Sequence, residues 1–320
     1  MSILAFVEIA EGAVRKSSLE AVGYASEVAK KLGTSATAVV LGEIASSELE
    51  NLGKVGATKV LHAADSRLNE GNIQAYASVL AQAVEKENAE VLVLAKSALG
   101  DAVSARVAAK IKASLVSNVV ELPDTSNGFV VKRSIYTGKA FAYTEMKSGK
   151  KIIAIKKNAY SPAETDNKAS IEAFSPTLND ADFNVKIKET VKATGDILLP
   201  EADIVVSGGR GLKGPENWGI IEELAKALGA ATACSKPVSD LDWRPHHEHV
   251  GQTGIKISPN LYIAVGISGA IQHLAGVNSS RVIVAINKDA DAPFFKAADY
   301  GIVGDAFDIV PRLTKAVKEL

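Results

Sequence analysis

Two segments in the C-terminal half of the chain carry the residues best suited to hold a ligand. One is Val250-Gly-Gln-Thr-Gly254, and the other, Ser268-Gly-Ala-Ile-Gln-His273, directly follows an apolar run at 261–267. The run is rich in β-forming residues and helix-forming residues follow the Ser-Gly pair, so a strand should lead into a helix through a tight turn. Unpaired backbone N–H groups and the positive end of the helix dipole meet at such a turn, and both favour a bound phosphate.

The polar side chains in these segments are hydrogen-bonding groups rather than obvious nucleophiles. Gln252, Thr253, Gln272 and His273 can each donate and accept hydrogen bonds. The only thiol, Cys234, ends a predicted buried strand, where a lone cysteine is more often a small core residue than a nucleophile. These residues therefore predict a binding site rather than a site of covalent catalysis.

A glycine-rich segment earlier in the same half leaves a nicotinamide cofactor open. Gly209-Arg-Gly-Leu-Lys-Gly214 fits G-x-G-x-x-G and follows a predicted strand at 202–206. The next strand, however, ends in Ala233-Cys-Ser-Lys236 and lacks the acidic residue that would bind the ribose hydroxyl. A nicotinamide role is therefore the weaker interpretation of this motif.

Three crowded histidines after Pro245 raise the question of a metal site. They are His246, His247 and His249, and only Cys234 could add a thiolate ligand. Because adjacent histidines on a loop often point apart, a solvated loop near the rim of the ligand site is favoured over a metal centre.

The elements that must position these residues alternate between strands and helices. In the N-terminal part, strands are predicted near 3–9, 36–41, 59–62 and 91–95, and helices near 17–32, 47–52, 72–87 and 101–111. This alternation indicates right-handed crossovers and a mostly parallel sheet covered by helices. Three further segments, at 129–134, 141–146 and 151–155, are predicted to form an antiparallel β appendage.

The alternation returns after a polar stretch that begins at 157. Strands are predicted at 202–206, 230–235, 261–267 and 281–286, and helices at 215–228, 270–275 and 306–319. We therefore expect an α/β protein with two domains, an N-terminal parallel-sheet domain at 1–192 and a second domain at 193–320.

Composition narrows the class of protein. The chain has 320 residues, 47% of them hydrophobic, and a formal net charge of -1, so no global field attracts nucleic acid or an anionic membrane. With one cysteine it cannot form an intrachain disulfide. No signal peptide or membrane-spanning segment is predicted, and we expect a cytoplasmic protein.

Five separated motifs, in order and spacing, resemble the FAD-binding domain of the electron-transfer flavoprotein alpha subunit. They are Val206-Ser-Gly-Gly-Arg-Gly-Leu212, the two segments described first, Ala285-Ile-Asn-Lys-Asp289 and Ala298-Asp-Tyr-Gly-Ile-Val303. A weaker resemblance covers the N-terminal part, around 106–110 and 135–138. The resemblance implies that the second domain is a Rossmann-like FAD-binding domain.

The resemblance also assigns positions to the cofactor. His273 matches a histidine that hydrogen-bonds the pyrimidine end of the flavin, Arg210 matches a loop arginine of the FAD site, and Asn287 and Asp305 match positions toward the ribityl-diphosphate and adenosine end. Where the family has Ser-Arg, with the arginine beside the flavin ring, this chain has Ser235-Lys236. The positions implied to bind FAD are Arg210, Ser235, Lys236, Val250, Gly251, Gln252, Thr253, Ser268, Gly269, Ala270, Ile271, Gln272, His273, Asn287, Asp305 and Ala306.

The function implied by the resemblance is that of a redox carrier rather than an enzyme. The second domain binds FAD, and the first domain docks a beta subunit, which is itself a candidate to bind AMP. Electrons pass from acyl-CoA dehydrogenases, in fatty acid β-oxidation, to the electron-transfer flavoprotein–quinone oxidoreductase of the membrane. Two alternatives stay open: an enzyme dependent on a nicotinamide or thiamine diphosphate, and a purely structural partner subunit.

Overall fold

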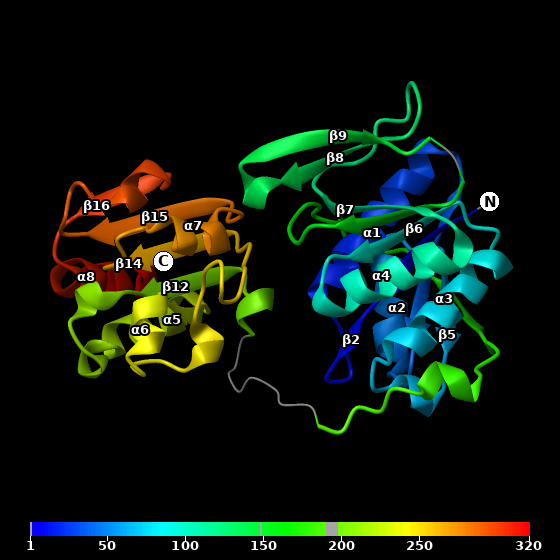
Figure 1. Ribbon diagram of the computed structural model, residues 1–320, viewed down its shortest axis with the longest axis horizontal. Helices are drawn as coiled ribbons and strands as arrows, with labels where there is room; N and C mark the ends of the chain where they lie inside the picture. Colours follow the sequence, from blue (N-terminus) through cyan, green and yellow to red (C-terminus); the bar gives the residue numbers. More distant parts are fainter. Residues whose placement is uncertain (1, 148, 190–197) are drawn as a thin grey trace. The chain divides into compact units, whose positions relative to one another are not determined.

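The computed structural model describes residues 2–147, 149–189 and 198–320, which form two compact units (Figure 1). One unit is formed by most of residues 1–190, and the other includes residues 191–320. The predicted domain boundary between residues 192 and 193 lies outside the described residues.

The first unit is built on a nine-stranded sheet, in the order β11-β5-β4-β1-β6-β10-β7-β8-β9. Its strands are β1 (Ser2–Val7), β4 (Ser35–Leu41), β5 (Lys59–Ala63), β6 (Val91–Ala95), β7 (Ser114–Val119), β8 (Val130–Ile135), β9 (Ala140–Glu145), β10 (Lys151–Ile155) and β11 (Ser170–Ala173). Its helices are α1 (Lys16–Lys31), α2 (Ser46–Lys54), α3 (Ile73–Lys86) and α4 (Ala98–Ile111). A two-stranded hairpin, β2 (Ile9–Ala10) and β3 (Ala13–Val14), follows β1.

The central strand β1 shows how the sheet is buried on both faces. Ile3, Ala5 and Val7 pack with α1 and α2, whereas Leu4 and Phe6 pack with α3 and α4. Side chains of a strand alternate between the two faces of the sheet, so an apolar run without polar interruption fits this position. The predicted parallel α/β architecture of the first unit is confirmed.

The antiparallel appendage is smaller than predicted. Of the three predicted appendage strands, only β8 and β9 form an antiparallel hairpin, at one end of the sheet (Figure 1). The third predicted appendage strand, at 151–155, is instead β10, which is parallel to both neighbours, β6 and β7. Its four apolar residues after Lys151 are all buried, which is typical of a central parallel strand.

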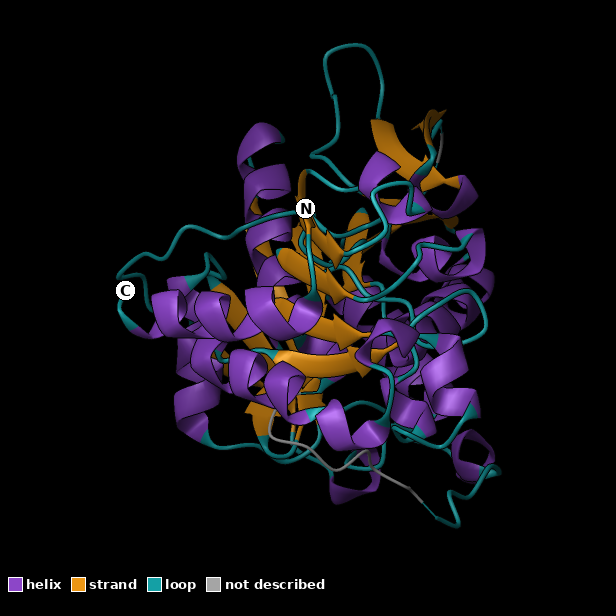
Figure 2. Cartoon of the chain, turned by 90° about the vertical axis from the view of Figure 1, so that its left-hand side faces the viewer, coloured by secondary structure: helices purple, strands orange, loops and turns teal. Residues whose placement is uncertain are grey.

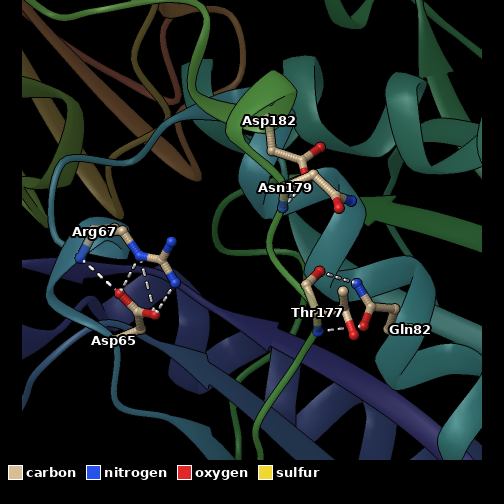
Figure 3. A network of polar contacts seen from close by, with 6 residues as sticks. All are labelled: Asp65, Arg67, Gln82, Thr177, Asn179 and Asp182. Atoms are coloured by element: carbon tan, nitrogen blue, oxygen red, sulfur yellow. Dashed lines mark hydrogen bonds and ion pairs between the residues drawn. The ribbon is translucent and has the colours of Figure 1, made fainter.

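The polar stretch after β10 packs on the first unit rather than leaving it as a linker. Thr177 and Gln82 of α3 exchange two hydrogen bonds, of 2.8 and 2.9 Å (Figure 3). Asp182 accepts a bond from the backbone of Asn179 and another from Ser78 on α3. Residues 185–189 form no strand.

The second unit is a five-stranded parallel sheet in the order β13-β12-β14-β15-β16. Its strands are β12 (Ile204–Gly208), β13 (Ala231–Cys234), β14 (Leu261–Val265), β15 (Val282–Asn287) and β16 (Tyr300–Val303). Its helices are α5 (Gly219–Leu228), α6 (Lys236–Asp240), α7 (Ile271–Val277) and α8 (Ala306–Lys318). This doubly wound arrangement confirms the predicted Rossmann-like fold, and Figure 2 shows the strands flanked by helices.

Two separate cores cover the faces of this sheet. Helices α5 and α8 pack on one face, against Val206, Ile263 and Val265. On the other face, Tyr262 packs with Val277 of α7 and with Phe294, which lies in a short 3-10 helix, Pro293–Lys296. The crossover helix after β12 and the helix after β14 therefore lie on opposite faces. Ligands of open α/β sheets bind at such a switch point, beyond the carboxyl ends of the strands.

Candidate site at the carboxyl edge of the second sheet

The predicted site residues gather at one edge of the second sheet because they follow parallel strands. Arg210 follows β12, Ser235 and Lys236 follow β13, the segment 268–273 follows β14, Asn287 ends β15, and Asp305 and Ala306 follow β16. The segment 250–254 is joined to this edge because Val250 N–H donates to the carbonyl of Cys234, the last residue of β13. Motifs far apart in sequence thus form one continuous region.

Glycines let the loops after the two central strands meet at the switch point. Gly211 N–H donates to the carbonyl of Gly266, at 3.0 Å. Gly266 has φ +62, and a Cβ there would lie 2.9 Å from the Cα of Gly211. A Cβ on Gly209 would lie 2.3 Å from the carbonyl oxygen of Gly266. Larger residues at these positions would separate the two loops.

The turn after β14 presents backbone donors. The carbonyl of Ile267 accepts from Asn287 Nδ2, and that of Ser268 accepts from the N–H of Phe294, both at 3.0 Å. Among the described residues, no acceptor pairs with the N–H groups of residues 267–270. Ser268 and Ala270 are exposed. Consecutive N–H groups without a partner in the described chain, two of them on exposed residues, suit an anionic group such as a phosphate.

Gly269 fixes the shape of this turn. It has φ +86, and a Cβ at this position would lie 2.5 Å from the backbone nitrogen of Phe294. The left-handed conformation and the close approach both require glycine. The turn is therefore built into the fold, and the residues present fit a bound diphosphate.

The loop at 250–254 is tied to α7. Gln252 N–H donates to the carbonyl of Gln272 at 2.7 Å, and Gly251 packs so closely on Gly276 that a Cβ on Gly276 would lie 2.5 Å from its nitrogen. The side chains of Gln252 and Thr253 are exposed, as are those of Ile271 and Gln272. The structure therefore places the two predicted motifs side by side, with polar side chains free for a ligand.

His273 points into the protein rather than toward solvent. Only 6% of its surface is exposed, its Nε2 lies 2.8 Å from the Tyr262 hydroxyl, and its ring meets the edge of Phe294. The pKa of this imidazole is lowered to about 4, chiefly by burial and in part by the neighbouring His249, while the backbone of Val250 opposes the shift. His273 is therefore neutral at pH 7. Because Tyr262 already takes one ring nitrogen, only Nδ1 remains for another partner.

Two cations at the edge are differently placed. Lys236 Nζ pairs with both oxygens of Asp240, four residues along α6, at 2.7 and 2.8 Å, and the side chain is 56% exposed. Arg210 is exposed and forms no ion pair with any residue in the described ranges. Arg210 is thus the cation most available to an anionic ligand, whereas Lys236 must first leave Asp240.

Asn287 and Asp305 each form hydrogen bonds within the chain that stabilise its local structure. Besides donating to Ile267, Asn287 accepts from the N–H of Asp289 through Oδ1, at 3.1 Å. Asp305 caps α8 by accepting from the N–H of Phe307 at 3.0 Å, and Ala306 is the buried first residue of that helix. Both polar side chains lie at the edge but already have partners within the protein.

The metal and thiol alternatives gain no support. Among residues 2–147, 149–189 and 198–320, no group of three or more histidines, cysteines or carboxylates could hold a metal ion. Cys234 is fully buried, and burial raises the pKa of its thiol to about 12, so it is protonated at pH 7. Cys234 is a core residue, as expected.

The nicotinamide interpretation of the segment 209–214 also lacks its expected geometry. Residues 210–212 and 215–217 form two 3-10 turns, and α5 begins only at Gly219. In a dinucleotide fingerprint the helix should open at the glycines themselves. Here the glycines instead allow contact with the loop after β14.

Three residues near the site were missed or misplaced by sequence reasoning. Tyr262 and Phe294 hold His273, but in sequence they are indistinguishable from other apolar core residues. His249 was predicted on a solvated loop, yet it is 2% exposed, while His246 and His247 are exposed as predicted. The Cβ position of Gly254 lies only 2.8 Å from His249 Nδ1, so the glycine-rich loop folds around this ring.

The chain is similar to known proteins over almost its whole length. Residues 3–179 match the family model described as Electron transfer flavoprotein domain, and residues 198–278 match Electron transfer flavoprotein FAD-binding domain. Electron transfer flavoprotein subunit alpha of Bacillus subtilis (strain 168) is 38% identical over 319 residues, which cover 99% of this chain and 98% of the relative. The subunit of the same name from Mycobacterium leprae (strain TN) is 37% identical over 320 residues, 98% of each chain.

No helix in the described ranges is long and apolar enough to cross a membrane. The relatives carry the name of electron transfer flavoproteins and so support the redox-carrier interpretation over the two alternatives. On the matches to both family models and to these full-length relatives, the chain belongs to the electron transfer flavoprotein alpha subunit family.

Proposed function

We propose that the second unit binds FAD non-covalently and that the chain serves as the flavin-carrying subunit of an electron carrier. The observation that carries this proposal is the edge itself: free N–H groups at 267–270 lie where the family model for an FAD-binding domain matches. When bound, the flavin supplies the redox chemistry. The chain has to bind it, orient it and tune its surroundings.

Each part of the edge has a separate task in this proposal. The N–H groups of 267–270 bind the diphosphate, with Ser268 to Ile271 lining it. Gln252 and Thr253, held by α7, hydrogen-bond the flavin ring together with Val250 and Gly251. His273 contributes through Nδ1, and Arg210 supplies positive charge. Ser235 and Lys236 flank the ring, and Asn287, Asp305 and Ala306 lie toward the adenosine end.

The proposal predicts that Ser268→Asp loses FAD. A carboxylate at this exposed position repels the diphosphate, and a unit charge about 4 Å away costs enough to weaken binding at least about tenfold. Ser268→Ala, which adds no charge, serves as the matched control. The flavin absorbance of the purified proteins and calorimetric titration with FAD measure the effect. A folded Ser268→Asp protein that binds FAD as tightly as the parent would place the diphosphate elsewhere.

We further propose that the domain at 1–192 docks a beta subunit, while the domain at 193–320 holds FAD. The support is the family and the lack of any recognised cofactor motif in the first unit. A stable interface of this kind buries upward of roughly 2,000 Å². Co-expression with the beta subunit followed by size-exclusion chromatography should give a 1:1 complex. Separate elution of the two chains would contradict this part.

The electron donors and acceptor follow from the family alone. We propose acyl-CoA dehydrogenases of fatty acid β-oxidation as donors and the electron-transfer flavoprotein–quinone oxidoreductase as acceptor, with AMP as a candidate ligand of the beta subunit. The free thiol of Cys234 fits a reducing compartment such as the cytoplasm. Anaerobic mixing with a substrate-reduced acyl-CoA dehydrogenase should bleach the flavin absorbance of the complex, and no bleaching would exclude that donor class.

A further inference from the structure

His249 lies buried inside the glycine-rich loop that the proposed function gives to the flavin. Its ring is 2% exposed, and Nδ1 makes no hydrogen bond to any residue in the described ranges. A Cβ on Gly254 would lie 2.8 Å from Nδ1, and one on Gly251 would lie 3.3 Å from Nε2. Both ring nitrogens therefore face the backbone of the loop that presents Gln252 and Thr253.

The ring of His249 has a solvent-exposed imidazole on one side and the core of the second unit on the other. The ring of His246, which is exposed, has its centroid 5.5 Å from that of His249. On the inner side, the Cβ position of Gly251 is also only 3.8 Å from the Cα of His273. His249 thus lies between the exposed ring of His246 and, across Gly251, the backbone of the buried His273.

Burial and nearby positive charge lower the pKa of His249 and so favour its neutral form. Burial is the largest cause of its lowered pKa, and His246 and Lys236 lower the pKa further, whereas Asp240 raises it. His273 faces it from α7 and is itself neutral. Lys236 is held by Asp240, so its positive charge is partly compensated. His249 is therefore an empty proton site at neutral pH, next to the loop assigned to the flavin.

We propose that His249 takes up a proton, delivered from solvent through His246, when the bound flavin is reduced to an anion. This inference rests on the proposed function. An electron supplied by a reductant enters the flavin, and a proton leaves solvent and binds His249, so the site gains no net charge. By linkage, the protonated imidazole makes reduction more favourable in return.

The neighbouring groups are less suited to this role. Arg210 and Lys236 are cationic side chains without an acceptor atom, so they offer no site for a further proton. His273 lies deeper, and its Nε2 is engaged with Tyr262. His246 is exposed, so solvent screens it from a buried negative charge. Among these groups, His249 combines burial, an unpaired Nδ1 and contact with the solvent-exposed ring of His246.

The test is histidine NMR of the FAD-loaded full chain. With ¹⁵N-labelled histidine, the ring signals that His249→Gln lacks are assigned to His249, and they are recorded in oxidised protein and after anaerobic reduction with dithionite at neutral pH. We expect these signals to move from the neutral to the imidazolium position on reduction. Signals that stay neutral in reduced protein would overturn the proposal.

Proton uptake gives a second readout. A pH-indicator dye should show that His249→Gln takes up about one proton fewer per reduced protein than the parent. His247→Gln, at an exposed neighbour, is the matched control and should take up as many protons as the parent. His246→Gln should take up the same number more slowly, and an unchanged rate would overturn the route through His246.

The flavin content of the same samples separates two kinds of failure. A parent protein that is folded but binds no FAD contradicts the proposed function, and this inference falls with it. A parent protein that binds FAD while His249 stays neutral on reduction contradicts only the inference. If His249→Gln does not fold, His249→Asn supplies the assignment, and the shift in the parent protein still decides.

Discussion

At the scale of residues, burial decides which polar groups of the site can meet a ligand. Within one turn of α7, Gln272 is exposed while the next residue, His273, is buried against Tyr262 and Phe294. Helical geometry turns successive side chains by about 100°, so neighbours in sequence serve opposite sides. The motif therefore combines an exposed surface, which we propose for the cofactor, with an anchor in the core.

Substitution of Lys236 tests whether this lysine leaves its ion pair with Asp240 to interact with the flavin. Its ion pair with Asp240 joins two side chains that are each more than half exposed, so the pair contributes at most about 0.5 kcal/mol and can open. We expect Lys236→Ala to leave the unfolding free energy of flavin-free protein nearly unchanged, yet to weaken FAD binding several-fold and make reduction harder, because positive charge favours the anionic reduced flavin.

Lys236→Arg is the control for this prediction, since it keeps the charge while altering the shape of the cation. Urea unfolding, titration with FAD and spectroelectrochemical titration measure the three quantities at matched ionic strength. If Lys236→Ala has the affinity and midpoint potential of the parent, the lysine stays with Asp240 and is not part of the site.

At the scale of elements, the site exists because five parallel strands end at one edge. Gly208, Val265 and Asn287 end β12, β14 and β15, so every predicted site residue lies at a strand end, in a loop at this edge or in the first turn of a helix. The helices after β12 and β14 lie on opposite faces of the sheet, which opens the switch point between them. Loops on this rigid sheet can vary without loss of the fold.

Two substitutions of Asp305 distinguish its role in capping α8 from a role in binding the cofactor. Asp305→Ala removes the acceptor for Phe307 N–H at the start of α8, and we expect a loss of about 1 kcal/mol in unfolding free energy. Asp305→Asn keeps an oxygen acceptor and should retain this stability. If the carboxylate contacts the cofactor, Asp305→Asn should still weaken FAD binding by roughly fivefold, the worth of one hydrogen bond.

Chemical denaturation and titration with FAD measure the two effects of Asp305 separately. Unchanged FAD affinity in Asp305→Asn, together with reduced stability in Asp305→Ala, would assign this residue to capping alone.

Sequence predicted the strands and the edge because apolar runs such as 261–267 stop at turn residues. Sequence reasoning failed where the orientation of a strand depends on its neighbours in the sheet. An apolar run such as 151–155 fits an edge or a central strand, and its pairing with β6 and β7 makes it a central parallel strand. The burial of His249 was missed for the same reason, since it depends on how the loop at 250–254 folds back on itself. Asp240 lies four residues after Lys236, a spacing that allows an ion pair on a helix. The sequence does not show whether Lys236 pairs with Asp240 or with a ligand.

At the scale of the whole molecule, each unit has its own cores, one on each face of its sheet. We expect the two units to unfold in separate transitions. FAD stabilises whichever unit binds it by mass action, so it should raise the midpoint of one transition only.

The same transition should be sensitive to acid. In folded protein, burial lowers the pKa of His273 from its ordinary value of 6.5 to about 4. Between these two pH values the unfolded chain binds a proton that the folded chain does not, so protons favour unfolding and stability falls as pH decreases from 6.5 to 4. The loss is of the order of 3 kcal/mol at most, and is complete only below the lower value.

Carboxylates also titrate in this range, so the test compares the parent with His273→Gln, which retains a hydrogen-bonding group for Tyr262 but has no proton to gain. We expect the stability of the FAD-responsive transition, measured by calorimetry and urea unfolding from pH 7 to pH 4.5, to depend less steeply on pH in His273→Gln than in the parent. The other transition should show the same pH dependence in both proteins. Equal slopes for the FAD-responsive transition would mean that His273 is protonated in the folded protein as readily as in the unfolded chain, and that its burial does not keep it neutral.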